Sequence, residues 1–316
     1  MIRMADEPDE TSNDWRDPEW PWWAKLRRAA QLIREVSQAC AAIDSDGAAW
    51  AVQREADDDQ SWRYRFHQGR AIPADLAVLV ADTIHNMRSA LDHVAYHLAE
   101  RHSGVLTDDR AQRTEFPIAA TAEGFDSWLK REHRGGLTRQ DLYGPDERKA
   151  LRCVQPFALR EEFQRHFEGD GRAFESQQFP EADPREDAAF VLNTLWNIDK
   201  HRRLPQLSWA MTASVFWDSP NPPTAYVWRS VAERESLSDG ALIGRFCNTH
   251  GQGRPLADPM IDFEIRLGDS PSRGGSDLTR TLQWLHLSIG GWVVPRMFIV
   301  ADGHEPPFGI SFVPMS

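Results

Sequence analysis

The side chains best suited to chemistry are concentrated in two short segments of the chain. The first contains Arg88, Asp92 and His93, and the second contains Lys200 and His201. Imidazole, guanidinium, ammonium and carboxylate groups are those with which proteins transfer protons, bind anions and hold metal ions. Because such groups are costly to bury without a reason, their position beside the most apolar stripes of the sequence predicts a polar site between two helices.

The first segment is expected to lie on a helix over residues 73–101. At about 100° per residue, the two flanks of that helix carry different sets of polar side chains. One flank has His85, Arg88, Asp92 and Tyr96, and the other has Asn86, His93 and His97. A helix that is polar on both sides of a narrow apolar seam fits inside a helical bundle, where its flanks line polar cavities.

An ordinary structural role would also explain several of these residues. Arg88 and Asp92 stand at i and i+4, the spacing of an ion pair on a helix. Lys200 and Arg202 fall in the last helical turn, where the macrodipole favours cations whatever the function. One hypothesis is therefore a non-catalytic helical bundle that binds a small ligand or a protein. Its sign would be a buried Arg88–Asp92 ion pair without an open cleft.

Arg88 and His93 also form the pattern R-x-x-x-x-H on a helix. This resembles the signature of the HEPN superfamily of helical-bundle ribonucleases. The resemblance implies metal-independent RNA cleavage, in which His93 moves protons for attack by the ribose 2′-hydroxyl and Arg88 stabilises charge on the phosphorane. It also implies a homodimer in which two motifs share a cleft. On an unbroken helix the two side chains point about 140° apart, so they meet only at a distorted helix or across an interface.

The resemblance covers only residues 88–93, and the position of the second segment beside its own apolar stripe adds further candidates to the expected site. The catalytic set is Arg88, Asp92, His93, Lys200 and His201, and the supporting set is His85, Asn86, Asn193, Asn197 and Arg202. RNA is the expected partner, and no cofactor is expected. The segment 85–93 together with 199–202 is also similar to a set of bacterial proteins, a resemblance that implies no activity.

A third hypothesis is a metal-dependent enzyme. His93 and His97 stand at i and i+4, which places two imidazoles on one helical face, and His201 is the natural third ligand. That spacing suits zinc or nickel and resembles DinB-like metal-binding bundles. The alternative is a pair of solvated histidines, because the pattern lacks the glutamate of H-E-x-x-H.

The elements that position these residues begin with helices and one hairpin. A helix is expected over residues 21–43, followed by a hairpin at about 48–67 in which apolar and polar residues alternate. The helix over 73–101 carries a heptad seam of Val80, Ile84, Met87, Leu91, Val94 and Leu98. So regular a seam predicts the central helix of a bundle. A further helix is expected over 138–154 and a long loop over 156–180.

The second half of the sequence changes from helical to strand periodicity. A helix begins at Asp183–Glu186, with an N-cap, a proline and a glutamate in order. Strands are expected over 207–217, 226–228, 242–247 and 261–267, and a final helix follows from Asp277 with Ser276 as its cap. The predicted fold class is α+β: an N-terminal helical bundle with an inserted β-hairpin, then an antiparallel sheet with a covering C-terminal helix. The expected divisions are a disordered acidic arm at 1–19, a helical domain at 20–203 and the sheet with its helix at 204–316.

Composition narrows the classes of partner. Lys and Arg number 36 against 48 Asp and Glu, a net charge of −12 that opposes non-specific binding to DNA. No apolar run approaches the roughly 18 residues of a membrane helix, since the best, 290–300, is interrupted by Pro295 and Arg296. The start has no apolar secretory segment, and the three cysteines are far apart, which favours the reducing cytoplasm.

Overall fold

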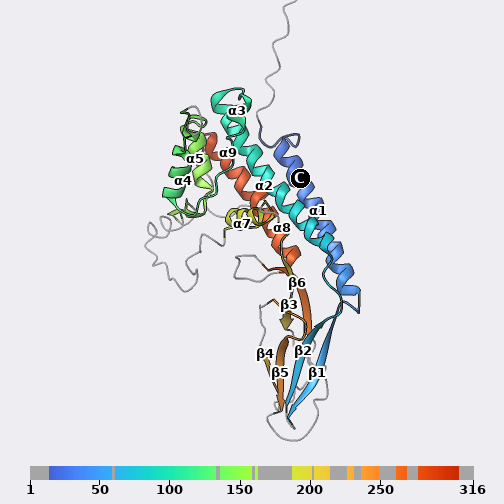
Figure 1. Cartoon of the computed structure of the whole chain (residues 1–316). Helices are drawn as coiled ribbons and strands as arrows, with labels where there is room; N and C mark the ends of the chain where they lie inside the picture. The colour runs from blue at the N-terminus through green and yellow to red at the C-terminus, as the bar shows by residue number, and fades with distance from the viewer. Residues whose placement is uncertain are drawn as a thin grey trace, which may run out of the picture. The chain divides into compact units, whose positions relative to one another are not determined.

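The computed structural model describes residues 14–58, 61–132, 136–158, 161–162, 187–200, 203–213, 226–230, 236–248, 261–268 and 277–305. Within these ranges the chain combines long helices with antiparallel strands (Figure 1), which confirms the α+β class. A long helix comes first, a hairpin follows it, and helices close the described part of the chain, as expected.

Two compact units are built from segments that lie far apart in the sequence. Unit 1 comprises residues 1–28, 86–174 and 287–316, and unit 2 comprises residues 29–85 and 175–286. Helix α1 (Pro21–Ser45) and helix α2 (Ala74–Ser103) each contribute residues to both units. Each unit is therefore described by itself below.

Helix α2 begins and ends close to where its periodicity predicts. Its six seam residues, Val80, Ile84, Met87, Leu91, Val94 and Leu98, have no exposed surface. Gly104 follows the helix with a φ of 71°, a left-handed conformation that glycine adopts without steric cost and that commonly ends helices. The prediction of a buried seam is thus confirmed, and it fixes the direction in which the polar flanks point.

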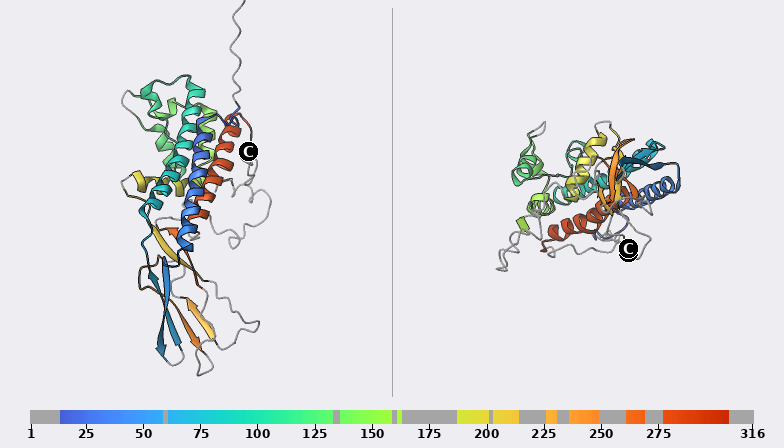
Figure 2. Two further views of the ribbon diagram at one scale, coloured as in Figure 1. Left: turned by 90° about the vertical axis from the view of Figure 1, so that its right-hand side faces the viewer. Right: turned by 90° about the horizontal axis from the view of Figure 1, so that it is seen from below.

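Unit 2 contains a four-stranded antiparallel sheet in the order β1-β2-β5-β4. These strands span Trp50–Asp58, Ser61–Gln68, Leu242–Asn248 and Tyr226–Ser230. The hairpin β1–β2 is therefore not separate from the later strands, because β2 pairs directly with β5 (Figure 2). A lone hairpin is marginally stable in water, and further strands supply the pairing that it needs.

Strands β3 (Leu207–Ala213) and β6 (Ile261–Leu267) form a second, two-stranded sheet in unit 2. Their alternation predicted them, although β3 is described only to residue 213 and residues 214–217 lie outside the described ranges. Phe66 of β2 packs on Phe263 and Trp209, with ring centroids 4.9 and 6.2 Å apart. The two sheets thus share one aromatic core.

Two helix caps differ from those that the sequence suggested. Helix α7 (Ala188–Lys200) is preceded by Asp187, whose Oδ1 accepts hydrogen bonds from the Ala189 and Phe190 amides. The expected start at 183–186 lies outside the described residues. Helix α8 (Leu278–Ser288) is capped by Asp277, which accepts from the Arg280 amide at 2.9 Å, and Ser276 is not described. In both cases an aspartate nearer the helix reaches the free N–H groups.

Unit 1 carries a set of short helices after α2. They are α3 (Asp108–Ala111), α4 (Ala122–Lys130), the 3-10 turn η1 (Arg139–Asp141) and α5 (Pro145–Cys153). The single helix expected over 138–154 is wrong, because it breaks at Gly144 and restarts with Pro145 in its first turn. In the region expected to be a long loop, residues 156–158 and 161–162 are helical, and 163–180 lie outside the described ranges.

Helix α8 continues through a π turn, η3 (Ile289–Val293), into α9 (Val294–Ala301). The stretch Leu278–Ala301 is long and apolar enough to cross a membrane by length and composition, and 72% of its most apolar window is buried inside the structure. This corrects the expectation that no such segment exists: Gly290–Gly291 and Pro295 do not interrupt the helix. It is weak evidence for a membrane span, since a buried core helix passes the same test.

The residues just before α1 differ from the expected disordered arm. Trp15 is 6% exposed and stacks on Phe298 of α9, with ring centroids 5.6 Å apart and planes 2° from parallel. Its carbonyl accepts a hydrogen bond from the Trp23 indole at 2.8 Å. Aromatic burial therefore orders residues 14–19, whereas residues 1–13 lie outside the described ranges.

Candidate functional site

Helix α2 brings Arg88 and Asp92 together on one flank in unit 1. The Arg88 Nη2 atom lies 3.1 Å from Asp92 Oδ1, and the Arg88 side chain is only 2% exposed. Burial lowers the pKa of Arg88, while Asp92 and Glu115 oppose that shift, so the guanidinium stays a cation. Burial raises the pKa of Asp92, against the opposing effects of Arg88 and the Phe116 amide. The expected i, i+4 pair is therefore present, and its cation is buried.

This ion pair holds both backbone polar groups of Phe116. Arg88 Nη2 donates to the Phe116 carbonyl at 2.7 Å, and Asp92 Oδ1 accepts from the Phe116 amide at 2.9 Å. Phe116 is itself buried, at 1% exposure. A buried backbone group without a hydrogen-bond partner is costly. Here the Arg88 and Asp92 side chains supply the donor and the acceptor that a neighbouring β-strand would otherwise provide. We call this arrangement of Arg88, Asp92 and Phe116 the Phe116 clamp.

Gln155, just beyond α5, completes the support of the same segment. Its amide oxygen accepts from the Ala119 amide at 2.9 Å, and its Nε2 donates to the carbonyls of Pro117 and Leu151 at 3.0 and 2.8 Å. Gln155 has no exposed surface. Residues 116–119 therefore form a segment, buried at Phe116 and Pro117 and half-buried at Ile118 and Ala119, whose backbone is paired with side chains. Sequence reasoning missed Gln155, because nothing in local periodicity connects it to residue 117.

A second arginine lies beside the Phe116 clamp. Glu115 reaches both cations, at 3.9 Å from Arg88 Nη2 and 3.5 Å from Arg139 Nη2. The Arg139 guanidinium lies over the Trp128 ring, 5.0 Å from its centroid. Within the described ranges, the buried Tyr143 hydroxyl and the Nε and Nη1 atoms of Arg139 have no hydrogen-bond partner. Burial also raises the pKa of Tyr143, so its hydroxyl stays protonated.

His93 lies on the same helix but in different electrostatic surroundings. Burial lowers the pKa of His93, Lys25 of α1 lowers it further, and Asp92 raises it. The imidazole is therefore neutral at pH 7 and could accept a proton. The contacts of Arg88 run instead to Phe116, Asp92 and Glu115.

His97 is part of an aromatic cluster. Its ring centroid lies 4.6 Å from Trp20, 5.3 Å from Trp22 and 5.8 Å from Phe298. Burial lowers the pKa of His97, which favours a neutral ring among these side chains. Among the described residues, no group of three or more His, Cys, Asp and Glu could hold a metal ion. The metal hypothesis thus gains no support from the part of the chain that is described.

The second predicted segment belongs to unit 2. Helix α7 carries Asn193, Asn197 and Lys200, and the Lys200 ammonium lies over the Trp196 ring, 4.5 Å from its centroid. His201 and Arg202 lie outside the described residues. His85 ends a segment of unit 2 and Asn86 begins one of unit 1. A composite site formed with α7 therefore stays a prediction.

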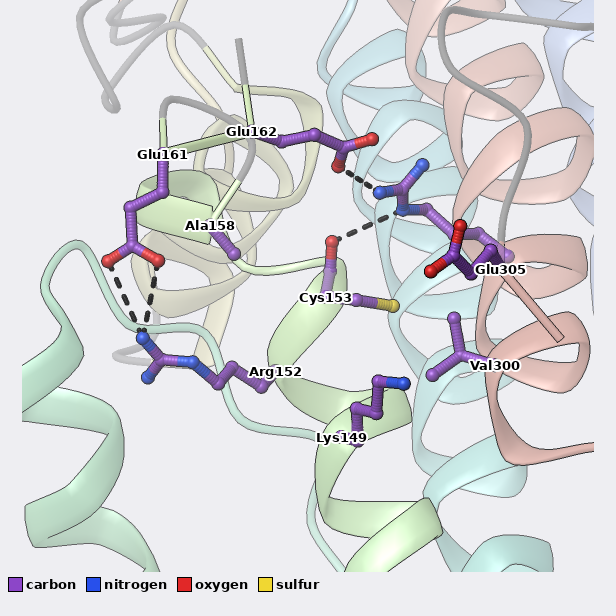
Figure 3. A pocket seen from close by; sticks show the side chains of 9 residues that line it. Lys149, Arg152, Cys153, Ala158, Glu161, Glu162, Val300 and Glu305 are labelled. Atoms are coloured by element: carbon purple, nitrogen blue, oxygen red, sulfur yellow. Dashed lines mark hydrogen bonds and ion pairs between the residues drawn. The ribbon is translucent and has the colours of Figure 1, made fainter. Parts of the chain in front are cut away.

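Unit 1 also contains an open cavity that the sequence did not suggest. It has a volume of about 320 Å³ and lies between α5, the residues just after it, and α9 (Figure 3). Its wall consists of Lys149, Arg152, Cys153, Ala158, Glu161, Glu162, Arg296, Val300 and Glu305. Helix α5 packs directly against α9, which fixes two sides of this α5–α9 cavity.

Four of the six charged residues around the cavity pair with one another. Arg152 Nη2 lies 3.4 and 3.3 Å from the two carboxylate oxygens of Glu161. Arg296 pairs with Glu162 and also donates from Nε to the Cys153 carbonyl at 3.3 Å. These pairs join α5, α9 and the residues after α5 around one space (Figure 3).

Lys149 and Glu305 differ from those four charged residues. In the part of the chain that the structure describes, neither has an ion pair or a hydrogen-bond partner, and both are exposed. Lys149 comes from α5, and Glu305 follows α9 (Figure 3). The Cys153 thiol adds no charge between them, because burial raises its pKa to about 11, against the effect of Arg296. The cavity thus offers one cation and one anion that the protein leaves without a counter-ion.

Comparison with known proteins does not add a family or a function to this geometry. No protein-family model, no curated protein and no solved structure gives a significant match to the chain.

Proposed function

We propose that this protein binds a small charged molecule in the α5–α9 cavity and performs no chemistry on it. One observation carries the proposal: Lys149 and Glu305 line the same cavity and have no counter-ion among the described residues, while their charged neighbours are paired. Sites for small molecules are concave and contain a few polar groups that orient the ligand. The volume of about 320 Å³ is at the low end of the usual range for such sites, roughly 300–1,000 Å³. A small ligand fits this description.

The Phe116 clamp supports a non-catalytic role for the Arg88 cluster. A catalytic arginine must reach the substrate, whereas the Arg88 side chain is 2% exposed and bonds the Phe116 carbonyl and Asp92. The sign expected for a binding protein is a buried Arg88–Asp92 pair without an open cleft, and the observed pair supports this reading in part, because Arg88 is buried while the Asp92 side chain is 36% exposed. The cluster then has a structural role, because its hydrogen bonds hold the backbone of Phe116 against α2. We call such buried supporting contacts the frame of unit 1.

Thermal denaturation of the full chain in the presence of simple probes tests the binding proposal. Acetate, inorganic phosphate, ethylammonium and glycine each present one or both charges that Lys149 and Glu305 could bind. At least one probe should raise the melting temperature of the wild type, because a ligand that binds only the folded state stabilises it. Lys149→Met should abolish that shift, and the matched control Lys130→Met, at the exposed end of α4, should retain it. No shift with any probe, or equal shifts in both variants, would exclude the cavity as the site.

A second candidate is a metal-independent endoribonuclease resembling HEPN proteins. The observation in its favour is His93, which is neutral at pH 7 and lies on the same helix as Arg88. In this reaction the ribose 2′-hydroxyl loses a proton to His93 and attacks the adjacent phosphorus. The 5′-oxygen leaves and takes up a proton from the protonated His93 or from water, so the products end in a 2′,3′-cyclic phosphate and a 5′-hydroxyl.

Incubation of the purified protein with single-stranded RNA in EDTA tests this second candidate. Cleavage that His93→Ala abolishes, and that the control His102→Ala retains, would establish the ribonuclease and displace the binding proposal. Cleavage that needs added zinc and is lost in His97→Ala would instead favour the metal hypothesis. RNA that stays intact in both buffers removes both enzymatic candidates.

A further inference from the structure

We propose that the ligand of the α5–α9 cavity is a small zwitterion of the amino-acid class, with its carboxylate on Lys149 and its ammonium on Glu305. This inference rests on the proposed function and names its ligand. It follows from the two charges of opposite sign that the cavity leaves without counter-ions.

The charge balance of the cavity favours a ligand that carries both charges over one that carries a single charge. The wall carries three cations and three carboxylates, and two of each pair with one another. A simple anion would satisfy Lys149 but leave Glu305 beside a partly desolvated space, and a simple cation would do the reverse. A zwitterion supplies a counter-ion to both residues and adds no net charge, so neither group loses water without gaining a partner.

The uncharged residues of the wall restrict the polarity of the spacer that joins the ligand's two charged groups. Val300 is 1% exposed and Ala158 is 8% exposed, and both are apolar. The Cys153 thiol is neutral because burial raises its pKa to about 11. A short aliphatic spacer matches these apolar surfaces, whereas a further charged or strongly polar group would find only residues that are already paired.

Isothermal titration calorimetry of the full chain tests the zwitterion directly. The probes are glycine, β-alanine, 4-aminobutanoate and 6-aminohexanoate, which separate the two charges by increasing lengths. Each is compared with the carboxylate and the ammonium compound of the same chain length. One member of the series should bind at least about tenfold more tightly than both of its singly charged analogues, because only it makes two charge-assisted contacts. The length of that member then measures the separation of the two binding groups.

A charge swap provides the second arm of the experiment. Lys149→Glu and Glu305→Lys should each reduce the affinity for the best zwitterion by about tenfold or more. The double variant should recover much of it, since a zwitterion can bind in the reverse direction. Both residues are exposed, so we expect the variants to fold, and their melting temperatures verify this. The control Lys130→Glu should bind as the wild type does.

The outcomes separate the two proposals. If a singly charged analogue binds as tightly as the zwitterion, or the double variant recovers no affinity, the ligand class is wrong and the binding function stands. If no probe binds and none shifts the melting temperature, both proposals fail together.

Discussion

Two arginine–carboxylate pairs of unit 1, Arg88–Asp92 and Arg152–Glu161, have different surroundings, which give them different roles. In the Phe116 clamp, Arg88 is 2% exposed, and both partners also bond the backbone of one buried residue. Around the α5–α9 cavity, Arg152 and Glu161 are 38% and 47% exposed and pair with each other, and the Arg152 guanidinium also lies over the Phe157 ring, 4.7 Å from its centroid. A pair that satisfies buried backbone groups is part of the frame. An exposed pair at an open cavity sets the local charge and leaves its neighbours available to a ligand. The Arg296–Glu162 pair belongs to both groups, because it lines the cavity, has a buried arginine and also bonds the Cys153 carbonyl.

The largest expected effect comes from removing the buried cation. Arg88→Ala should lower the free energy of unfolding by about 3–5 kcal/mol, because it removes a buried side chain, leaves the buried Phe116 carbonyl without a donor and leaves the half-buried Asp92 without its cation. Arg152→Ala removes an exposed pair and should cost no more than about 1 kcal/mol. Urea denaturation of both variants measures the difference. Equal losses would contradict the distinction between frame and cavity.

The next effect concerns the other support of the extended segment. Gln155→Leu should destabilise the protein by roughly 2–6 kcal/mol, since it leaves the Pro117 carbonyl and the Ala119 amide without partners, at about 1–3 kcal/mol each. The same substitution at Gln140, which is exposed, is the control. A variant as stable as the control would show that residues 116–119 find other partners.

A smaller effect follows from pH through His97. Burial lowers its folded pKa below the ordinary value of 6.5, so below that pH the unfolded chain binds more protons than the folded one. The contribution of His97 to stability is therefore present above about pH 6.5 and is lost as the pH falls towards the folded pKa. Comparing urea denaturation at about pH 7.5 and about pH 5.5, His97→Phe should lose less stability on acidification than the wild type does.

The wild type must be compared with His97→Phe because a second group, Asp187, also titrates in this pH range. Burial raises its pKa to about 6, against the Phe190 and Ala189 amides, so its folded form takes up a proton before the unfolded form does. Its effect on stability in the same pH range has the opposite sign to that of His97, and it cancels in the difference between wild type and His97→Phe. An identical pH dependence of the two proteins would refute the role given to His97.

The smallest effect is expected at Tyr143. Its hydroxyl is buried and has no hydrogen-bond partner among the described residues, so Tyr143→Phe removes a polar atom without breaking a described contact. The melting temperature should stay the same or rise, with a change in unfolding free energy within about 1 kcal/mol. A clear loss of stability would show that the hydroxyl has a partner that matters to the frame.

Sequence periodicity predicted the elements that depend on local pattern. The seam of α2 was readable because its apolar residues recur every three or four positions, and the Arg88–Asp92 pair because i and i+4 share a helix face. The alternation of apolar and polar residues predicted the strands of unit 2. It did not predict that β2 pairs with β5, because paired residues such as 62 and 246 are far apart in the sequence. The helix break at Gly144 and Pro145 has a local signal, since proline favours the first turn of a helix, but the apolar periodicity of 138–154 hides it.

The candidate site was predicted less well, for a physical reason. The helical pattern identified Arg88 and Asp92 but gave no sign of Phe116 or Gln155. The bonds of Phe116 to Arg88 and Asp92, and of Gln155 to Pro117, join residues that are 24 to 38 positions apart. The α5–α9 cavity combines residues 149–162 with 296–305, and no spacing rule connects those segments. Lys149 and Glu305 stand out only because the other charged residues of the wall are paired, and those pairs can be recognised only in the structure.

The most direct test of the whole account is a two-dimensional ¹H–¹⁵N NMR titration of the full chain with the tightest-binding zwitterion. We expect the amide signals of Lys149, Cys153, Val300 and Glu305 to shift, and those of Arg88, Asp92 and Phe116 to stay unchanged. Shifts centred on Arg88 and His93, with the cavity unaffected, would contradict it.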